Sequence, residues 1–317
     1  MWVGRAESIR IPFRSRRKRL RSVKPKRISG NMRERYTKAQ KIASVIMPVA
    51  AVIIAVTYFL ALKYDFDFSI GHFRSNSVPF IIMVAVSAAS AVASALFALL
   101  AKKCVSVDGE ERTSVVSLFA SILAAVICIG LVIFEIRDGN ALKIVSAVLL
   151  LPAGAALVLS GLDKKNRFAR LRTVAYIAGA VSVIIISYVN YFDFSTPMDG
   201  AVRNITIILQ SSVLFFFLSE ARLSFGKETG LITSRFYVFT AMILSSLTLG
   251  YSAGAAVFRI VCNNPSDPNT GLMRLVLYFS VAVIGLTQSV FFSGIAGDPL
   301  PPEPKEDRKK KSSNVWD

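Results

Sequence analysis

The chain has 317 residues, of which 53% are hydrophobic, and it carries a formal net charge of +18. Its mean hydropathy is +0.53, and its apolar residues fall in long blocks that contain almost no charge. Blocks of about 18 or more apolar residues indicate membrane spans, so the composition excludes a soluble domain large enough to hold an active site.

Metal and haem chemistry is disfavoured by the scarcity of ligating side chains. His72 is the only histidine, and Cys104, Cys128 and Cys262 form neither a CxxC pair nor a Cys/His cluster. Zinc sites and haem groups held by two histidines need such residues. We therefore expect no metal and no cofactor. The predicted topology keeps the three cysteines apart, so we also expect no disulfide.

Residues 1–41 form a basic N-terminal arm that holds 15 Lys and Arg residues and two acids, a net charge of +13. We expect this arm to be cytoplasmic and largely disordered, because it has too little apolar surface to fold. A basic segment beside a membrane is attracted to anionic lipid headgroups, although retention of the N-terminus inside is the simpler role. Nucleic acid is disfavoured because aromatic side chains are scarce in the arm. The residues predicted to contact lipid headgroups are Arg16, Arg17, Lys18, Arg19 and Arg21.

The apolar blocks predict an all-α, polytopic membrane bundle with eight transmembrane helices. The first four spans form a unit over residues 42–162 and the last four a unit over residues 173–296. A proline-rich, charged tail over residues 298–317 is expected to be disordered and cytoplasmic. The spans are predicted at residues 42–62, 78–100, 114–134, 144–162, 173–190, 204–219, 236–258 and 275–296.

The distribution of basic residues predicts the orientation of these spans. With the N-terminus inside, 31 Lys and Arg residues fall on the inner side and seven on the outer side. Short loops rich in Lys and Arg stay in the cytoplasm, and an even number of spans places both basic ends on one side. We therefore expect a protein of the plasma membrane with both termini in the cytoplasm.

A repeated tetrapeptide predicts an internal duplication. Phe-Asp-Phe-Ser occurs at residues 66–69 and again at residues 192–195. The same offset brings spans 2, 3 and 4 close to spans 6, 7 and 8. Two units of four spans would share one orientation, with their symmetry axis along the membrane normal.

The eight predicted span cores contain no Asp, Glu, Lys, Arg or His. Ionisable residues inside a membrane mark proton relays and catalytic sites, so we expect neither membrane-embedded catalysis nor a proton-coupled carrier with a carboxylate at the midplane. Arg203 and Glu220 flank the short sixth span. We predict that both side chains reach outward to water.

Four polar residues are the candidates for substrate binding. Gln210 and Gln288 lie near the middle of the sixth and eighth spans, where they are suited to a neutral or zwitterionic solute. Hydrogen bonding between helices is the simpler interpretation of both amides. Asp67 and Asp193, in the two repeated loops, are candidates for attracting a cation or a basic partner. Interfacial aromatic residues and helix caps are the structural alternative there.

Two classes of function stay open. A permease-like carrier of a small neutral or zwitterionic solute is favoured by the predicted duplication and by the central amides. A non-catalytic membrane scaffold, regulator or partner subunit of a membrane complex fits charge-free spans equally well. The GxGxxG, Walker and metalloprotease signatures are absent.

Overall fold

The computed structural model describes residues 30–69, 71–74, 76–101, 114–163, 167–192, 200–225, 231–262 and 271–295. Within these ranges, eight helices are long and apolar enough to cross a membrane. The predicted helical membrane bundle with eight spans is therefore confirmed.

The elements follow the predicted spans closely. The seventh span consists of α7 and α8 joined by a π-helical segment, Leu244–Thr248, and a second π-helical segment of the same length, Ala61–Asp65, continues α1. The helices are α1 (Gly30–Leu60), α2 (Val78–Leu100), α3 (Val115–Asp138), α4 (Ala141–Leu162), α5 (Ala169–Phe192), α6 (Gly200–Phe225), α7 (Leu231–Ile243), α8 (Leu249–Cys262) and α9 (Leu272–Ile295); the strands are β1 (Phe66–Asp67) and β2 (His72–Phe73).

Side-chain caps explain where several helices begin. The Ser77 hydroxyl accepts a hydrogen bond from the Phe80 amide at the start of α2, and Ser114 caps α3 in the same way. α3 ends at Gly139, whose φ of 73° is a left-handed conformation that glycine adopts without strain. The next residue, Asn140, caps α4 through its side-chain oxygen, so two residues suffice to reverse the chain.

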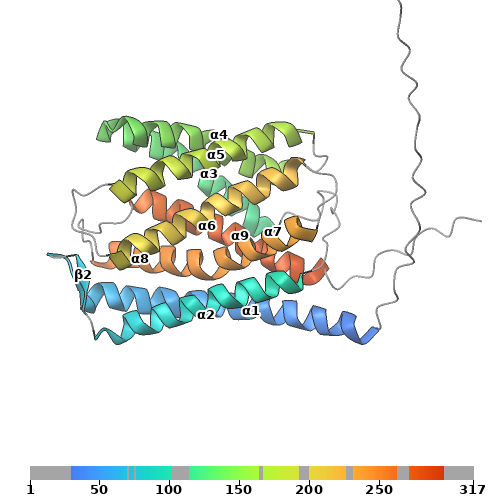
Figure 1. Cartoon of the computed structure of the whole chain (residues 1–317). Helices are drawn as coiled ribbons and strands as arrows, with labels where there is room; N and C mark the ends of the chain where they lie inside the picture. Colours follow the sequence, from blue (N-terminus) through green and yellow to red (C-terminus); the bar gives the residue numbers. More distant parts are fainter. Residues whose placement is uncertain are drawn as a thin grey trace, which may run out of the picture.

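The helices lie nearly parallel in one elongated bundle (Figure 1). The ends of the described chain, at Gly30 and Ile295, lie at the same end of this bundle, which we call the terminal end. The opposite end, which carries β1 and β2, is called the hairpin end. This arrangement is what an even number of spans requires.

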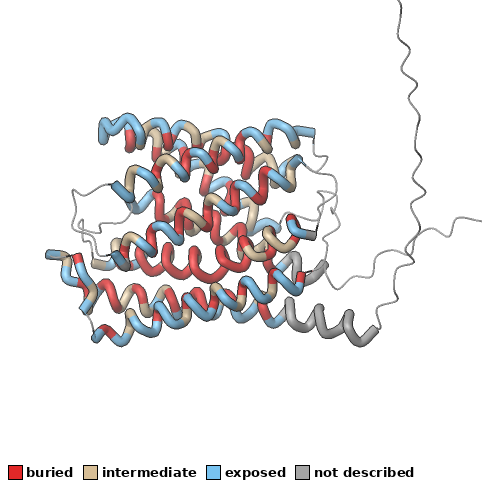
Figure 2. Tube along the Cα trace, in the orientation of Figure 1, coloured by how far each residue is buried: buried red, intermediate tan, exposed pale blue. Residues whose placement is uncertain are grey.

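The π-interrupted span α7–α8 is the most buried part of the bundle (Figure 2). It packs against α1 and α2 on one side and against α6 and α9 on the other. In its most apolar stretch 78% of the residues are buried, against 22% in α2, which lies at the edge. α4 and α5 form the opposite edge, where α4 packs on α3 and α5 packs on α6.

Close backbone contact between α1 and α8 depends on two glycines. A Cβ atom at Gly250 would lie 2.8 Å from the Ala51 carbonyl oxygen, and one at Gly254 would lie 2.7 Å from the Ala55 carbonyl oxygen. These distances are too short for any side chain. Small residues are the usual means of close helix packing in membranes, where no hydrophobic force drives association.

Two features of the N-terminal half differ from expectation. α1 begins at Gly30, so the end of the predicted arm is helical and continuous with the first span. The first Phe-Asp-Phe-Ser segment enters a short antiparallel hairpin in which Phe66 pairs with Phe73. Phe68 stacks on Phe258 of α8 at a centroid distance of 5.8 Å, so the hairpin is docked by its aromatic side chains.

Candidate functional site

α6 carries one buried polar side chain near its middle and another near its C-terminal end, with large apolar side chains between them. Gln210 lies toward the hairpin end and is 1% exposed, whereas Glu220 lies toward the terminal end and is 8% exposed. Ten residues of α-helix separate the two, a rise of about 15 Å. We describe the two polar sites in turn and then the layer between them.

The first site is a small pocket between α5 and α6 at the hairpin end, called here the α5–α6 pocket. Its volume of about 10 Å³ is close to what a single water molecule needs. Most of its wall is apolar surface, although six of the seven residues that line it carry a polar group. The residues that line it are Ser187, Asn190 and Tyr191 from α5 and Arg203, Thr206, Ile207 and Gln210 from α6.

Gln210 is the most unusual residue of this pocket. Neither its amide nitrogen nor its amide oxygen forms a hydrogen bond, although both atoms are buried. The Tyr278 hydroxyl of α9 lies close enough to interact with the Gln210 amide and with Arg274, but outside hydrogen-bond geometry with the amide. A buried polar group without a partner costs about 1–3 kcal/mol, so this amide raises the energy of the folded state.

Two of the three hydroxyl-bearing residues that line the pocket donate their hydroxyl hydrogens to backbone carbonyl groups. Ser187 donates its hydroxyl hydrogen to the Val183 carbonyl oxygen at 2.7 Å, and Thr206 donates to the Val202 carbonyl oxygen at 3.1 Å. Each hydroxyl oxygen therefore has lone pairs left to accept a hydrogen bond. With Arg203 as a cation and Gln210 as both donor and acceptor, the pocket presents donors and acceptors together.

The second site is centred on Glu220 and is called the Glu220 cluster. Gln288 of α9 donates to Glu220 Oε1 at 2.7 Å, and the Tyr237 hydroxyl of α7 donates to the same oxygen at 3.1 Å. The charges of Glu220 and Arg172 both act on the buried Tyr176 hydroxyl of α5, which donates to the Ala156 carbonyl oxygen. Four helices thus contribute to one buried polar cluster near the terminal end.

An apolar layer on α6 separates the α5–α6 pocket from the Glu220 cluster. Val213, Phe216 and Phe217 are each at most 1% exposed. The Phe217 ring stacks on the Tyr176 ring at a centroid distance of 6.3 Å. A Cβ atom at Gly179 of α5 would lie 3.2 Å from Phe217, so the missing side chain of Gly179 makes room for this ring. We call these three α6 residues the aromatic layer.

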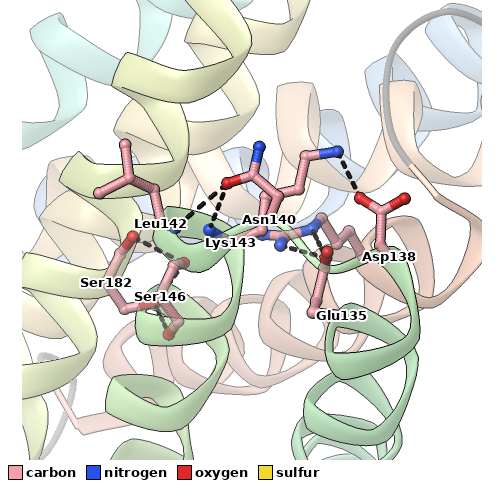
Figure 3. A network of polar contacts seen from close by, with 8 residues as sticks. Glu135, Asp138, Asn140, Leu142, Lys143, Ser146 and Ser182 are labelled. Atoms are coloured by element: carbon pink, nitrogen blue, oxygen red, sulfur yellow. Dashed lines mark hydrogen bonds and ion pairs between the residues drawn. The ribbon is translucent and has the colours of Figure 1, made fainter.

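A buried ion pair joins α3 and α9 at the hairpin end. Arg274 donates to Glu135 Oε1 from its terminal nitrogen at 2.5 Å and from Nε at 3.2 Å. The two side chains are only 9% and 5% exposed. Figure 3 shows Glu135 beside the turn between α3 and α4, where the exposed pair of Lys143 and Asp138 also lies.

The α3–α4 turn lies beside a hydroxyl contact between α4 and α5, also drawn in Figure 3. Ser182 donates to the Ser146 carbonyl oxygen at 2.6 Å, and the two hydroxyl oxygens are 3.1 Å apart. Hydrogen bonds of this kind between helices are common for polar residues in membrane spans.

Three of the four predicted substrate residues are described by the structure, and they lie apart from one another. Gln288 bonds to Glu220 and therefore lies at the other site from Gln210. Asp67 is in the hairpin, where its side chain accepts hydrogen bonds from the Ser69 amide and hydroxyl, and it does not line the α5–α6 pocket. Asp193 and the lipid-contact residues Arg16, Arg17, Lys18, Arg19 and Arg21 lie outside the described residues.

The prediction that Glu220 reaches outward to water is wrong. Glu220 is buried because α6 extends to Phe225, beyond the predicted span end, and because α7 and α9 cover it with hydrogen-bond donors. Glu135, Arg172 and Arg274 are buried in the same manner at other helix ends. The burial of these four charged residues is not predicted from the sequence, because the predicted span cores stop just short of each of them.

The helical spacing of buried residues in α3 and α9 indicates that Glu135 and Arg274 are buried. Glu135 follows the buried residues Cys128 and Leu131 at helical spacing, so it continues the buried face of α3. Arg274 precedes Tyr278 and Val281 on α9 in the same way. A charged residue on the buried face of a helix requires a partner, which the sequence alone did not name.

The arrangement offers hydrogen-bonding groups and charges but no metal site. Among the described residues, no three His, Cys, Asp or Glu side chains lie close enough together to hold a metal ion. Comparison with protein-family models, with curated proteins and with solved structures returns no match.

Proposed function

We propose that the protein is a permease-like, non-catalytic carrier of a small neutral or zwitterionic solute in the plasma membrane. The observation that supports this best is the order of sites along α6. A polar pocket near the hairpin end and a polar cluster near the terminal end are separated by the aromatic layer Val213, Phe216 and Phe217. A carrier needs a solute site that is closed to one side of the membrane at a time. In this proposal, the aromatic layer closes the α5–α6 pocket toward the terminal end.

In this proposal, the solute enters the α5–α6 pocket and passes to the Glu220 cluster when the aromatic layer opens. A Cβ atom at Gly179 of α5 would lie 3.2 Å from the Phe217 ring of α6, so a small shift between these two helices would displace the ring. Intramembrane ionisable residues are functional candidates by default, because a buried charge is costly to retain. Glu220 and Arg172 are such residues.

The proposal includes an internal duplication of a four-helix unit, with both termini in the cytoplasm. Successive helices pair in both units, since α1 packs on α2 and α3 on α4, while α5 packs on α6 and α8 on α9, and the two units also pack on each other through α1 on α8, α3 on α9 and α4 on α5. Each unit thus has its first two helices paired and its last two helices paired.

The test is solute entry into liposomes that contain the purified protein. After a hyperosmotic step, light scattering reports the entry of glycine, L-alanine, glycine betaine, urea or glycerol. We expect saturable entry of at least one of these solutes. Gln210→Leu should slow it by about tenfold or more, since one lost polar contact is worth about 1.4 kcal/mol. Ser212→Ala, two residues away and outside the pocket, is the matched control. Rates equal to those of protein-free liposomes for every solute would reject the carrier.

A second candidate is a non-catalytic scaffold, regulator or partner subunit of a membrane complex. The exposed face of α2 favours it: Val92, Leu96 and Leu99 form a stripe that is 56–60% exposed. Lipid covers such a stripe equally well, so it does not by itself indicate a partner. A photo-crosslinker at Leu96 that links the chain to a second polypeptide in native membranes, together with no solute entry, would select this candidate.

A further inference from the structure

The contacts between helices divide the bundle into two groups of four spans. In the first group, α3 packs on α4, α4 on α5 and α5 on α6. In the second group, α1 packs on α2 and α8, α7 packs on α2, and α9 packs on α1 and α8. We call the first group the middle-span body and the second the end-span body. These bodies cut across the two predicted four-span units, because each body takes two spans from each unit.

Close glycine contacts hold the helices together within each body. A Cβ atom at Gly179 would lie 2.6 Å from the Ala153 side chain in the middle-span body, and one at Gly285 would lie 2.5 Å from the π-helical segment in the end-span body. Between the bodies, a Cβ atom at Gly130 of α3 would lie 3.6 Å from Met273 of α9, an ordinary van der Waals distance. The packing at these glycines is therefore tighter inside the bodies than across the seam between them.

Buried charged side chains bridge the seam between the two bodies. Arg274 of α9 donates to Glu135 of α3, and Glu220 of α6 accepts hydrogen bonds from Tyr237 of α7 and Gln288 of α9. Interfaces between parts of a chain that move relative to each other are typically more polar than permanent ones. The seam has this polar character.

The seam is closely packed on one side and sparsely packed on the other. α3 packs extensively on α9, whereas α6 packs less extensively on α7 and only sparsely on α9. On the sparse side, the hydrogen bonds of Glu220 join the bodies near the terminal end. Toward the hairpin end, the Gln210 amide lies beside the Tyr278 hydroxyl of α9, and neither of its polar atoms forms a hydrogen bond. Closing the seam over this amide is unfavourable, and water would satisfy the amide if the seam opened.

We propose that the two bodies pivot about the α3–α9 contact and separate along α6 at the hairpin end, while the Glu220 hydrogen bonds keep the terminal end closed. The chain passes between the bodies after α2 and after α6, and the helix ends on either side of both connections lie at the terminal end (Figure 1). Rotation of rigid parts about an interface is a common form of conformational change. This inference deepens the proposed function, on which its role in transport rests, although the motion itself does not require transport.

Double electron–electron resonance on spin-labelled chains in lipid nanodiscs measures this motion. Labels at Asn204 of α6 and Val78 of α2 span the hairpin end of the seam, and labels at Leu218 and Leu99 on the same two helices span its terminal end; all four residues are exposed. We expect two distances for the first pair and one narrow distance for the second. Labels at Asn204 and Leu142, both in the middle-span body, are the control and should give one narrow distance. An Asn204–Val78 distribution no wider than this control would overturn the proposal.

A variant at Gln210 tests why the seam opens at the hairpin end. Gln210→Leu should lower the ratio of separated to closed molecules by at least about fivefold, because closure no longer buries an amide without partners. Ser212→Ala is the matched control, since the Ser212 hydroxyl donates only within α6, to the Ile208 carbonyl oxygen. It should leave the ratio unchanged. An equal ratio in Gln210→Leu and wild type would overturn the role of the amide.

Variants at Glu220 test the bonds that hold the terminal end. Glu220→Leu removes both hydrogen bonds across the seam and should broaden the Leu218–Leu99 distance, whereas Glu220→Gln keeps an acceptor oxygen and should not. Tyr237→Phe removes one of the two bonds with little change in shape, so it serves as the test if Glu220→Leu does not fold. A Leu218–Leu99 distance that stays narrow in Tyr237→Phe and in any folded Glu220→Leu chain would show that these bonds do not hold the seam.

The outcomes distinguish this inference from the carrier function. Separation at the hairpin end without solute entry into liposomes would retain the two moving bodies and reject the carrier. Saturable solute entry with one narrow distance for every labelled pair would retain the carrier and reject the moving bodies.

Discussion

Breaking the ion pair between Glu135 and Arg274 should strongly destabilise the bundle. Each charge lies at the unfavourable end of its own helix: Glu135 is in the last turn of α3 and Arg274 in the first turn of α9. A helix has a negative C-terminal end and a positive N-terminal end, so each residue is repelled by its own helix and stabilised by the other residue. Removing one partner leaves a buried charge with nothing to offset that repulsion.

The expected loss can be estimated from burial. The side chains of Arg274 and Glu135 are 9% and 5% exposed, so solvent screens the pair weakly. Removing one partner of such a pair costs about 3–5 kcal/mol. The exposed pair of Lys143 and Asp138, with side chains 27% and 46% exposed, is a matched control in the same region. Breaking a surface pair costs about 0–1 kcal/mol, so Lys143→Gln should be nearly neutral.

Thermal or SDS-induced unfolding in detergent micelles measures these effects. Glu135→Ala should unfold well before the wild type, and Lys143→Gln should unfold with it. The double variant Glu135→Arg, Arg274→Glu restores the pair and moves each charge to the favoured helix end, at a gain of about 0.3–1 kcal/mol for each charge. The double variant should therefore recover most of the stability that Glu135→Ala loses. The reasoning is refuted if Glu135→Ala and Lys143→Gln have equal effects, or if the exchanged pair is no more stable than Glu135→Ala.

Three further predictions concern packing, topology and the arm. Gly250→Ala should cost about 1–3 kcal/mol in the unfolding assay, because its Cβ would meet the Ala51 carbonyl, whereas Gly200→Ala, with no atom within 4 Å, should be neutral. In a cysteine-free chain, a cysteine at Asp138 should react with an impermeant thiol reagent outside intact cells and one at Arg167 should not; the reverse pattern would invert the orientation. Replacing the predicted lipid contacts with glutamine should weaken attachment of the arm to anionic bilayers by about 1 kcal/mol per residue, as measured by quenching of a fluorescent probe near residue 20. Equal exposure of the probe in neutral and in anionic lipid would reject that role. The residues to replace are Arg16, Arg17, Lys18, Arg19 and Arg21.

The number of spans could be predicted because it depends on one quantity, the length of apolar runs. Long charge-free runs leave no alternative to crossing the membrane. The ends of the helices were harder to predict, since hydropathy falls at the first charged residue whether or not that residue is buried. Glu220 illustrates this: the predicted span ends before it, yet hydrogen bonds from Tyr237 and Gln288 keep it within the bundle. The duplication and the orientation stay predictions.

The candidate site could be predicted only in part. Gln210 was identified because an amide inside an apolar run is conspicuous, but the sequence paired it with Gln288, which instead serves Glu220. The pocket around Gln210 depends on which residues of α5 and α6 face each other, and this contact between helices has no signature in a single sequence. Arg203 was interpreted as a helix-end anchor for the same reason.

The π-helical segment Leu244–Thr248 has a consequence for how the central span is built. A π turn holds about one more residue than an α turn, so α7 and α8 are out of phase by roughly 100° compared with an uninterrupted helix. The first half of this span packs on α2, α6 and α9, while the second half packs mainly on α1 and α9. Deleting one residue at Ser245 or Ser246 would turn the two halves against each other by over a quarter of a revolution. A single inserted residue thus lets one helix meet two sets of neighbours that a continuous α-helix could not face at once.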